Sequence, residues 1–268
     1  MSAGRADPGV DARRAHAPRR TRPTWRERED RFVAWVRRVL RLPRTWRVDG
    51  VRYKERTRVS LRRALDKHGE GVKVYDVTFP GPNAPPPMAI HATRDRVFAD
   101  LAPCERAQAI EVLRPRIRPG QRVFELGCGT GAASDILSQL VGPSGGVVSV
   151  GFDRESIRFA RRRYPRSNLG FELGGVETLD GEIQGAFDAV VAHTLGADSR
   201  AERENALLEL WRVVAPGGTL CVRTSVGDAS ETTEMLVRRL LRDASVDHAS
   251  TPDAGVSWII AGRPAEKS

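Results

Sequence analysis

Cysteine and lysine are both scarce in this 268-residue sequence. The three cysteines, Cys104, Cys128 and Cys221, follow no spacing typical of a metal site or a disulfide framework. An odd number of thiols suits a reducing compartment, so we expect a cytoplasmic protein without a bound metal. Lysine occurs four times against 40 arginines, a bias that we attribute to a GC-rich coding sequence rather than to phosphate binding.

Long apolar stretches are missing as well. No run approaches the roughly 18 apolar residues that a membrane-spanning helix needs. The arginines near the N-terminus are not followed by the apolar segment of a secretory signal. We therefore expect a chain that is neither membrane-spanning nor secreted.

Acidic residues are scarce only at the N-terminus. Residues 1–63 hold 20 basic and 7 acidic residues, whereas residues 64–268 hold 24 basic and 27 acidic ones. The net charge of +10 therefore belongs to the N-terminal quarter. Because the remainder is slightly acidic, we do not expect nucleic acid as a partner.

The N-terminal segment has a basic character throughout. Residues 1–23 contain almost nothing to bury and are predicted to be a disordered tail. Apolar residues at helical spacing predict a helix that begins at Thr24 and stops before Pro43, with arginines on its other face. Two interpretations stay open for residues 24–63: a basic amphipathic surface for an anionic membrane or acidic partner, or a helix that packs on the domain.

Next along the chain we expect a second basic helix over 55–68, a short strand over 72–79, and a linker or lid hinge over 80–88. Residues 24–90 are thus predicted to form a helical extension with a lid.

From residue 91 to 264, strand and helix patterns alternate. The expected strands are 121–126, 146–152, 168–173, 186–192 and 217–224, with a hairpin near 246–251 and 256–262, and the expected helices are 103–113, 131–141, 155–163, 200–214 and 230–244. Several strands are apolar on both faces, as in parallel sheets covered by helices. The pattern predicts a doubly wound, Rossmann-like α/β domain.

Three glycines follow the first of these strands at alternate positions, Gly127, Gly129 and Gly131. Glycines there allow a sharp turn and a close approach of a ligand, and such sheets bind ligands beyond the carboxyl ends of their strands. Glu125 lies two residues before the turn. A carboxylate repels phosphate, so its presence favours a cation or an ammonium group.

A dinucleotide is the alternative ligand. The string "GCGTGA" (127–132) fits a relaxed dinucleotide fingerprint, and Asp153 follows at a suitable distance. However, an NAD-dependent oxidoreductase would need a catalytic Tyr-x-x-x-Lys or similar pair, and all four lysines lie outside the α/β core.

The string "VFELGCGTGAAS" (123–134) resembles the first motif of class I S-adenosylmethionine-dependent methyltransferases, of the small-molecule type. Three further stretches are similar to this family in the same order: "VVSVGFDRESIRFARRRY" (147–164), "FDAVVAHTL" (187–195) and "LLELWRVVAPGGTLCV" (207–222). The resemblance implies S-adenosylmethionine as the cofactor and a seven-stranded sheet of order 3-2-1-4-5-7-6 with strand seven antiparallel.

The resemblance also assigns cofactor contacts. Glu125 would face the ammonium group directly or through water, and Asp153 would accept hydrogen bonds from both ribose hydroxyls, although it also suits a helix N-cap. Arg154 or Phe152 would pack along the adenine. The full set is Glu125, Leu126, Gly127, Cys128, Gly129, Gly131, Asp153, Arg154, Gly175, Val176 and Ala192.

One position departs from the family pattern. Gly175 stands where an aspartate often holds the adenine amino group. We expect the backbone of Gly175 and Val176, or the side chain of Glu177, to replace it. The departure also keeps a non-catalytic binding or scaffold protein open as an alternative.

His193, directly after the fourth strand, is the candidate general base or acceptor contact. His91, Tyr75 and Arg94 are further candidates from the N-terminal approach. The predicted reaction is methyl transfer by in-line displacement to a small-molecule, lipid or carbohydrate acceptor.

Overall fold

The computed structural model describes residues 44–56, 73–92, 98–101, 104–179, 181, 183–225, 228–251 and 256–265, which belong to the unit Arg44–Ser268. The predicted disordered tail, the predicted helix after Thr24 and most of the predicted helix over 55–68 lie outside these residues, and stay predictions. Among the described helices, none has the length and apolar character to cross a membrane.

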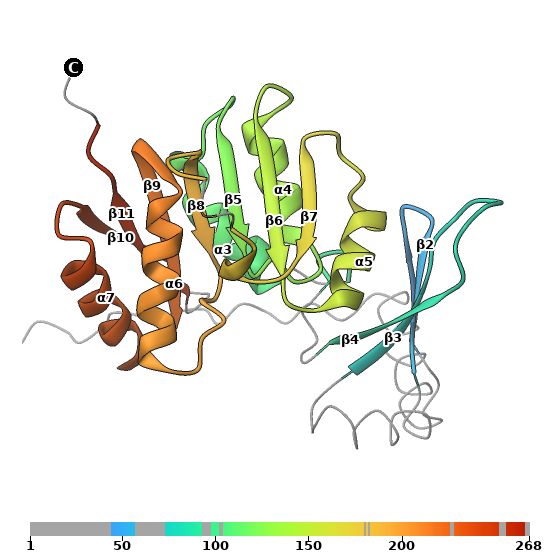
Figure 1. The fold of residues 1–268 in the computed structure, drawn as a ribbon. Coiled ribbons are helices and arrows are strands. Elements are labelled where there is room, and N and C mark those ends of the chain that lie inside the picture. Colours follow the sequence, from blue (N-terminus) through green and yellow to red (C-terminus); the bar gives the residue numbers. More distant parts are fainter. Residues whose placement is uncertain are drawn as a thin grey trace, which may run out of the picture. The chain divides into compact units, whose positions relative to one another are not determined.

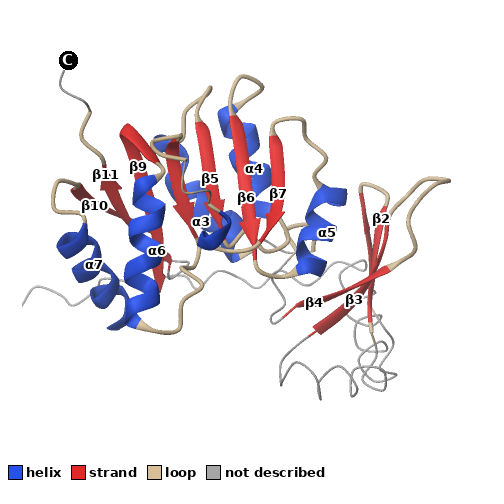
Figure 2. Ribbon diagram, viewed as in Figure 1, coloured by secondary structure: helices blue, strands red, loops and turns tan. Residues whose placement is uncertain are grey.

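Seven strands form the main sheet, in the order β10-β11-β9-β8-β5-β6-β7 (Figures 1 and 2). Their bounds are β5 Arg122–Leu126, β6 Gly146–Gly151, β7 Leu169–Leu173, β8 Phe187–Ala192, β9 Val214–Ser225, β10 Ser245–Thr251 and β11 Val256–Gly262. The strands β7, β6, β5, β8 and β9 run parallel, and β11 is antiparallel to both β9 and β10. This confirms the predicted doubly wound fold, including the strand order and the reversed strand.

Helices cover both faces of this sheet. They are α3 Glu105–Leu113, α4 Ala132–Val141, α5 Arg154–Arg163, α6 Arg200–Arg212 and α7 Asp228–Leu240, with short 3-10 turns at Arg114–Arg116 (η1) and Val176–Thr178 (η2). In Figure 2, α6 lies in front of the strands and α4 behind them. Alternation along β5 sends Phe124 into the apolar layer with α6 and α7, and Val123 into the layer with α3 and α4. Glu125 therefore points toward the α4 face.

The N-terminal part of the described chain is a four-stranded antiparallel sheet, β1-β2-β3-β4. Its strands are β1 Thr45–Val48, β2 Val51–Glu55, β3 Lys73–Thr78 and β4 Met88–Ala92. The strand expected over 72–79 is confirmed as β3. Strands rather than helices therefore form the described part of the extension predicted over 24–90. No element was predicted over β1 and β2, although buried and exposed residues alternate along β2 as in a half-buried sheet. The linker predicted over 80–88 is confirmed as a loop over 80–87, and β4 begins at Met88.

This sheet packs on α5. Tyr53 of β2 and Phe159 of α5 belong to one apolar cluster, with ring centroids 6.2 Å apart. Beside them, the Arg163 guanidinium donates to both oxygens of Asp100, at 2.6 and 2.8 Å, and the Tyr53 hydroxyl donates to the same carboxylate. A bidentate, largely buried pair of this kind joins the two sheets through α5.

Candidate functional site

The glycine turn connects β5 to α4 at the carboxyl end of the sheet. Gly127, Gly129 and Gly131 all have left-handed backbones, with φ of 83°, 59° and 84°. A Cβ at Gly127 would lie 2.8 Å from Thr194 Cγ2, and one at Gly131 would lie 2.8 Å from Ala160 Cβ. The glycines are therefore needed both for their backbone conformation and for close packing around the turn.

Glu125, at the end of β5, is wholly buried in a polar cluster. Its Oε2 accepts hydrogen bonds from the hydroxyls of Ser134 (2.5 Å) and Ser149 (2.7 Å), and its Oε1 lies 3.0 Å from His193 Nε2. The donors come from α4, from β6 and from the residue that follows β8. The carboxylate thus ties together the three elements that surround the turn.

The protonation states of the pair follow from these contacts. Burial by itself raises the pKa of Glu125, but the hydrogen bonds from His193, Ser134 and Ser149 outweigh burial, and the pKa is lowered. Burial lowers the pKa of His193, and the charges of Arg106 and Arg223 add to that effect against the opposing Glu125. We infer an ionised Glu125 that accepts from a neutral imidazole protonated at Nε2.

The second ring nitrogen of His193 is left without a partner. In the neutral tautomer Nδ1 is an acceptor, and this buried atom accepts no hydrogen bond from the described part of the chain. The ring is held edge-on against Trp258, with centroids 5.5 Å apart. An unpaired buried nitrogen in a fixed ring is unusual enough to mark a functional position.

Arg106 of α3 crosses the glycine turn. Its Nε donates to the Gly127 carbonyl at 2.9 Å, and a Cβ at Gly129 would lie 3.2 Å from its Nη1. The guanidinium therefore places a positive charge on the turn, close to the buried negative charge of Glu125. Sequence analysis missed this residue because it lies on a separate helix, 21 positions before the turn.

An open rim follows β6. Asp153 is exposed and caps α5, with its Oδ2 accepting from Ser156 N at 2.8 Å. Its Oδ1 has no partner among the described residues. Phe152 is 49% exposed, and its ring lies against Gly196 of the loop after β8. Arg154 is exposed at the first position of α5.

The region after β7 is shaped around Gly175. The glycine precedes the η2 turn, and a Cβ built on it would lie 2.5 Å from Glu177 Oε2. The Glu177 carboxylate thus occupies the space that a side chain at 175 would take. Val176 is half-buried and packs against the apolar layer of α6 and α7.

The remaining predicted residues divide into buried and distant ones. Leu126, Cys128 and Ala192 are buried, so only their backbone can meet a ligand, and burial raises the pKa of the Cys128 thiol well above its ordinary value. Tyr75 is buried in the cluster of the N-terminal sheet, and His91 is exposed on β4. Neither lines the cavity at His193, and Arg94 lies outside the described residues.

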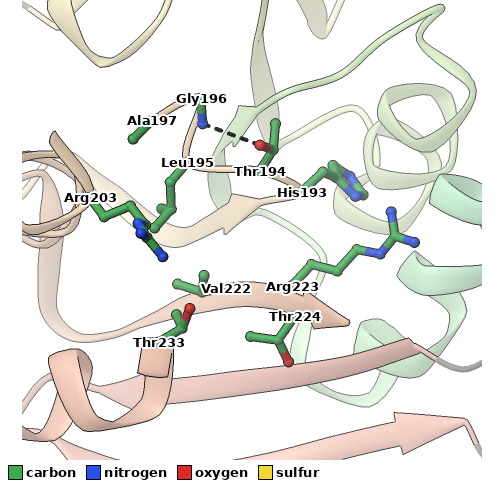
Figure 3. A pocket seen from close by; sticks show the side chains of 10 residues that line it. All are labelled: His193, Thr194, Leu195, Gly196, Ala197, Arg203, Val222, Arg223, Thr224 and Thr233. Atoms are coloured by element: carbon green, nitrogen blue, oxygen red, sulfur yellow. Dashed lines mark hydrogen bonds between the residues drawn. The ribbon is translucent and has the colours of Figure 1, made fainter. Parts of the chain in front are cut away.

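A cavity of about 330 Å³ lies beside His193. Figure 3 shows the residues that line it: His193, Thr194, Leu195, Gly196, Ala197, Arg203, Val222, Arg223, Thr224 and Thr233. They come from the loop after β8, from β9, and from α6 and α7. Sequence analysis found His193 here but missed the two arginines, because nothing in their local pattern distinguishes them from surface arginines.

Known proteins resemble this α/β region. Residues 117–260 match the model of a methyltransferase domain family. The chain is 38% identical over 108 residues to an uncharacterized 37.1 kDa transposon protein of Streptomyces fradiae, covering 38% of this chain and 30% of that protein. It is 30% identical over 118 residues to an arsenite methyltransferase of Aquipseudomonas alcaligenes (41% and 34% covered) and 34% identical over 110 residues to a demethylmenaquinone methyltransferase of Lactococcus lactis (40% and 43% covered). The chain thus spans less than half the length of each of these relatives.

Proposed function

This chain belongs to the class I S-adenosylmethionine-dependent methyltransferase family, and from that premise we propose that it transfers a methyl group from S-adenosylmethionine to a small-molecule acceptor. Two relatives are named for small acceptors, demethylmenaquinone and arsenite. These names favour a small acceptor over a macromolecule.

The residues around the turn fit S-adenosylmethionine. This cofactor carries an ammonium, a carboxylate, a ribose diol and an adenine, and the site offers a group suited to each. The observation that carries the proposal is the exposed Asp153 carboxylate, whose Oδ1 has no described partner, at the end of the strand next to the glycine turn. A carboxylate with an available oxygen suits two neighbouring hydroxyl donors.

The charges along the turn match the amino-acid end of the cofactor. We assign the cofactor carboxylate to Arg106, whose guanidinium lies on Gly127 and Gly129. Both oxygens of Glu125 are already engaged by three protein donors. We therefore assign it an electrostatic role beneath the ammonium group rather than a direct hydrogen bond.

For the adenine we assign Phe152 as the apolar surface and the Glu177 carboxylate as the acceptor for the amino group. When bound, S-adenosylmethionine supplies a methyl group that is already activated on a sulfonium. The task of the chain is then to orient the acceptor in line with it, and we propose His193, whose Nδ1 has no described partner, as the base for an acceptor that must lose a proton.

Calorimetric titration with S-adenosylhomocysteine tests the cofactor assignment. We expect binding in the micromolar range, and no heat with NADH. Absence of S-adenosylhomocysteine binding would refute the proposal, and binding of NADH in its place would point to a dinucleotide enzyme. The basic segment over 24–63 remains a proposed contact for an anionic membrane or acidic partner.

A further inference from the structure

The cavity beside His193 is separated from the glycine turn by a single loop, residues 193–197. A Cβ at Gly127 would lie 2.8 Å from Thr194 Cγ2 and 3.6 Å from His193 Cβ. On the same loop, a Cβ at Gly196 would lie 2.6 Å from the Phe152 ring. The loop therefore faces the proposed cofactor site on one side and the cavity on the other.

The charge of the cavity has one sign. Of the ten described residues that line it, two are arginines and none is acidic. Figure 3 shows Arg203 and Arg223 on either side of Val222, with Arg223 extending toward the His193 ring. Both arginines are half-buried, so their charges are less screened than those of fully exposed side chains.

The two guanidinium groups come from different elements, Arg203 from α6 and Arg223 from β9. Among the described residues, Arg203 makes a hydrogen bond of 3.3 Å to the Ser199 carbonyl and no ion pair. A planar guanidinium matches carboxylate and phosphate oxygens, which it can bind with two parallel hydrogen bonds. Thr194 is exposed at the rim of the same cavity and supplies a hydroxyl.

His193 borders the cavity, but its ring is not available to a ligand there. The side chain is fully buried and is held by Glu125 and Trp258. The two guanidinium groups are therefore the charged groups that decide which ligand the cavity favours, and they favour an oxyanion.

We propose that this cavity is the acceptor site, and that it takes a small organic acid whose carboxylate or phosphate is bound by Arg203 or Arg223. The volume of about 330 Å³ is at the lower end of the range for small-molecule sites. The proposal rests on the proposed methyl transfer, which it narrows to acidic acceptors.

Ligand-observed NMR titration of the full chain with benzoate and phenyl phosphate tests this, with benzamide as the neutral probe. We expect at least one of the two anions to bind, with millimolar affinity or better, and benzamide to bind about tenfold more weakly. Arg203→Gln or Arg223→Gln should remove most of that difference. Arg200→Gln is the matched control, because Arg200 is on the same helix, is exposed and pairs with Glu204.

The titrations are run with and without S-adenosylhomocysteine, whose own binding is measured on every variant. Unchanged S-adenosylhomocysteine binding shows that a variant is folded. The proposal of an acidic acceptor would be overturned by any of three results. These are equal affinity for benzoate and benzamide, unchanged anion binding in both arginine variants, and no anion binding at all. Failure of S-adenosylhomocysteine alone to bind would instead refute the proposed function, while the anion titrations would still report on the cavity.

Discussion

Glu125 and Asp153 occupy equivalent places in the sequence, because each lies at the end of one of two neighbouring parallel strands. Their surroundings differ in burial and in hydrogen bonding. Glu125 is buried, and its oxygens are engaged by Ser134, Ser149 and His193. Asp153 is exposed and uses one oxygen to cap α5. The comparison teaches that the buried carboxylate belongs to the folded core as much as to the site, whereas the exposed one can serve a ligand with little cost to the fold.

We expect the largest effect, on stability, from replacing the buried carboxylate of Glu125. Glu125→Ala leaves three donors without an acceptor, so we expect the free energy of unfolding to fall by about 3 kcal/mol. Urea denaturation followed by circular dichroism measures this. Glu155→Ala, on the first turn of α5, is the control and should change stability by less than about 0.5 kcal/mol. An unchanged midpoint for Glu125→Ala would mean that the cluster does not support the fold.

Lowering the pH should also destabilise the protein through the buried pair of Glu125 and His193. The pKa of Glu125 is lowered in the folded state, so its contribution to stability is present above its unfolded pKa and is lost as pH falls through the folded pKa. The pKa of His193 is also lowered, so stability begins to fall below about pH 6.5, where the unfolded imidazole takes up a proton. The melting temperature should therefore decrease from pH 7 to pH 4.

Glu125→Gln provides the comparison for this titration, because it removes the titrating carboxyl and keeps its shape. Its melting temperature should be lower at pH 7 but should depend less on pH. Parallel curves for the wild type and the variant would show that other groups control the acid response.

The exposed carboxylate should behave differently. Asp153→Asn keeps a good N-cap for α5, so stability should be preserved, while the loss of the negative charge should weaken S-adenosylhomocysteine binding at least about tenfold, or 1.4 kcal/mol. Calorimetry measures the affinity and thermal melting measures the fold. If affinity is unchanged while the fold is intact, Asp153 is only a cap.

The sequence predicts the α/β half of this molecule well for a physical reason. Several helices there have local start or stop signals, such as Ser199 with Glu202 at the start of α6 and Gly142 after α4. In the N-terminal sheet the sequence predicts only β3, although Asp49-Gly50, with φ of 48° and 80°, is a two-residue hairpin turn between β1 and β2. The basic composition of the segment obscured this signal.

In the candidate site, too, some features could be predicted from the sequence and others could not. The carboxylates and glycines follow from their place at strand ends. The hydrogen bond between Glu125 and His193 joins residues 68 positions apart, and Arg106 reaches the turn from another helix. Burial and protonation of such groups depend on tertiary contacts that no local pattern encodes.

The smallest expected effect concerns the adenine. The Glu177 carboxylate lies beside Gly175, in the space where a side chain at 175 would begin, so it is placed to replace the missing aspartate. Glu177 is exposed, and the contribution of one hydrogen bond there is modest, so we expect Glu177→Gln to weaken S-adenosylhomocysteine binding about threefold. Glu172→Gln, an exposed change on β7, should leave the affinity unchanged.

The decisive comparison uses the inosine analogue, S-inosylhomocysteine, which lacks the amino donor. The wild type should bind the adenine form more tightly than the inosine form, and Glu177→Gln should reduce that preference. If the variant weakens both ligands equally, Glu177 does not contact the amino group, and the backbone of Gly175 and Val176 becomes the better candidate.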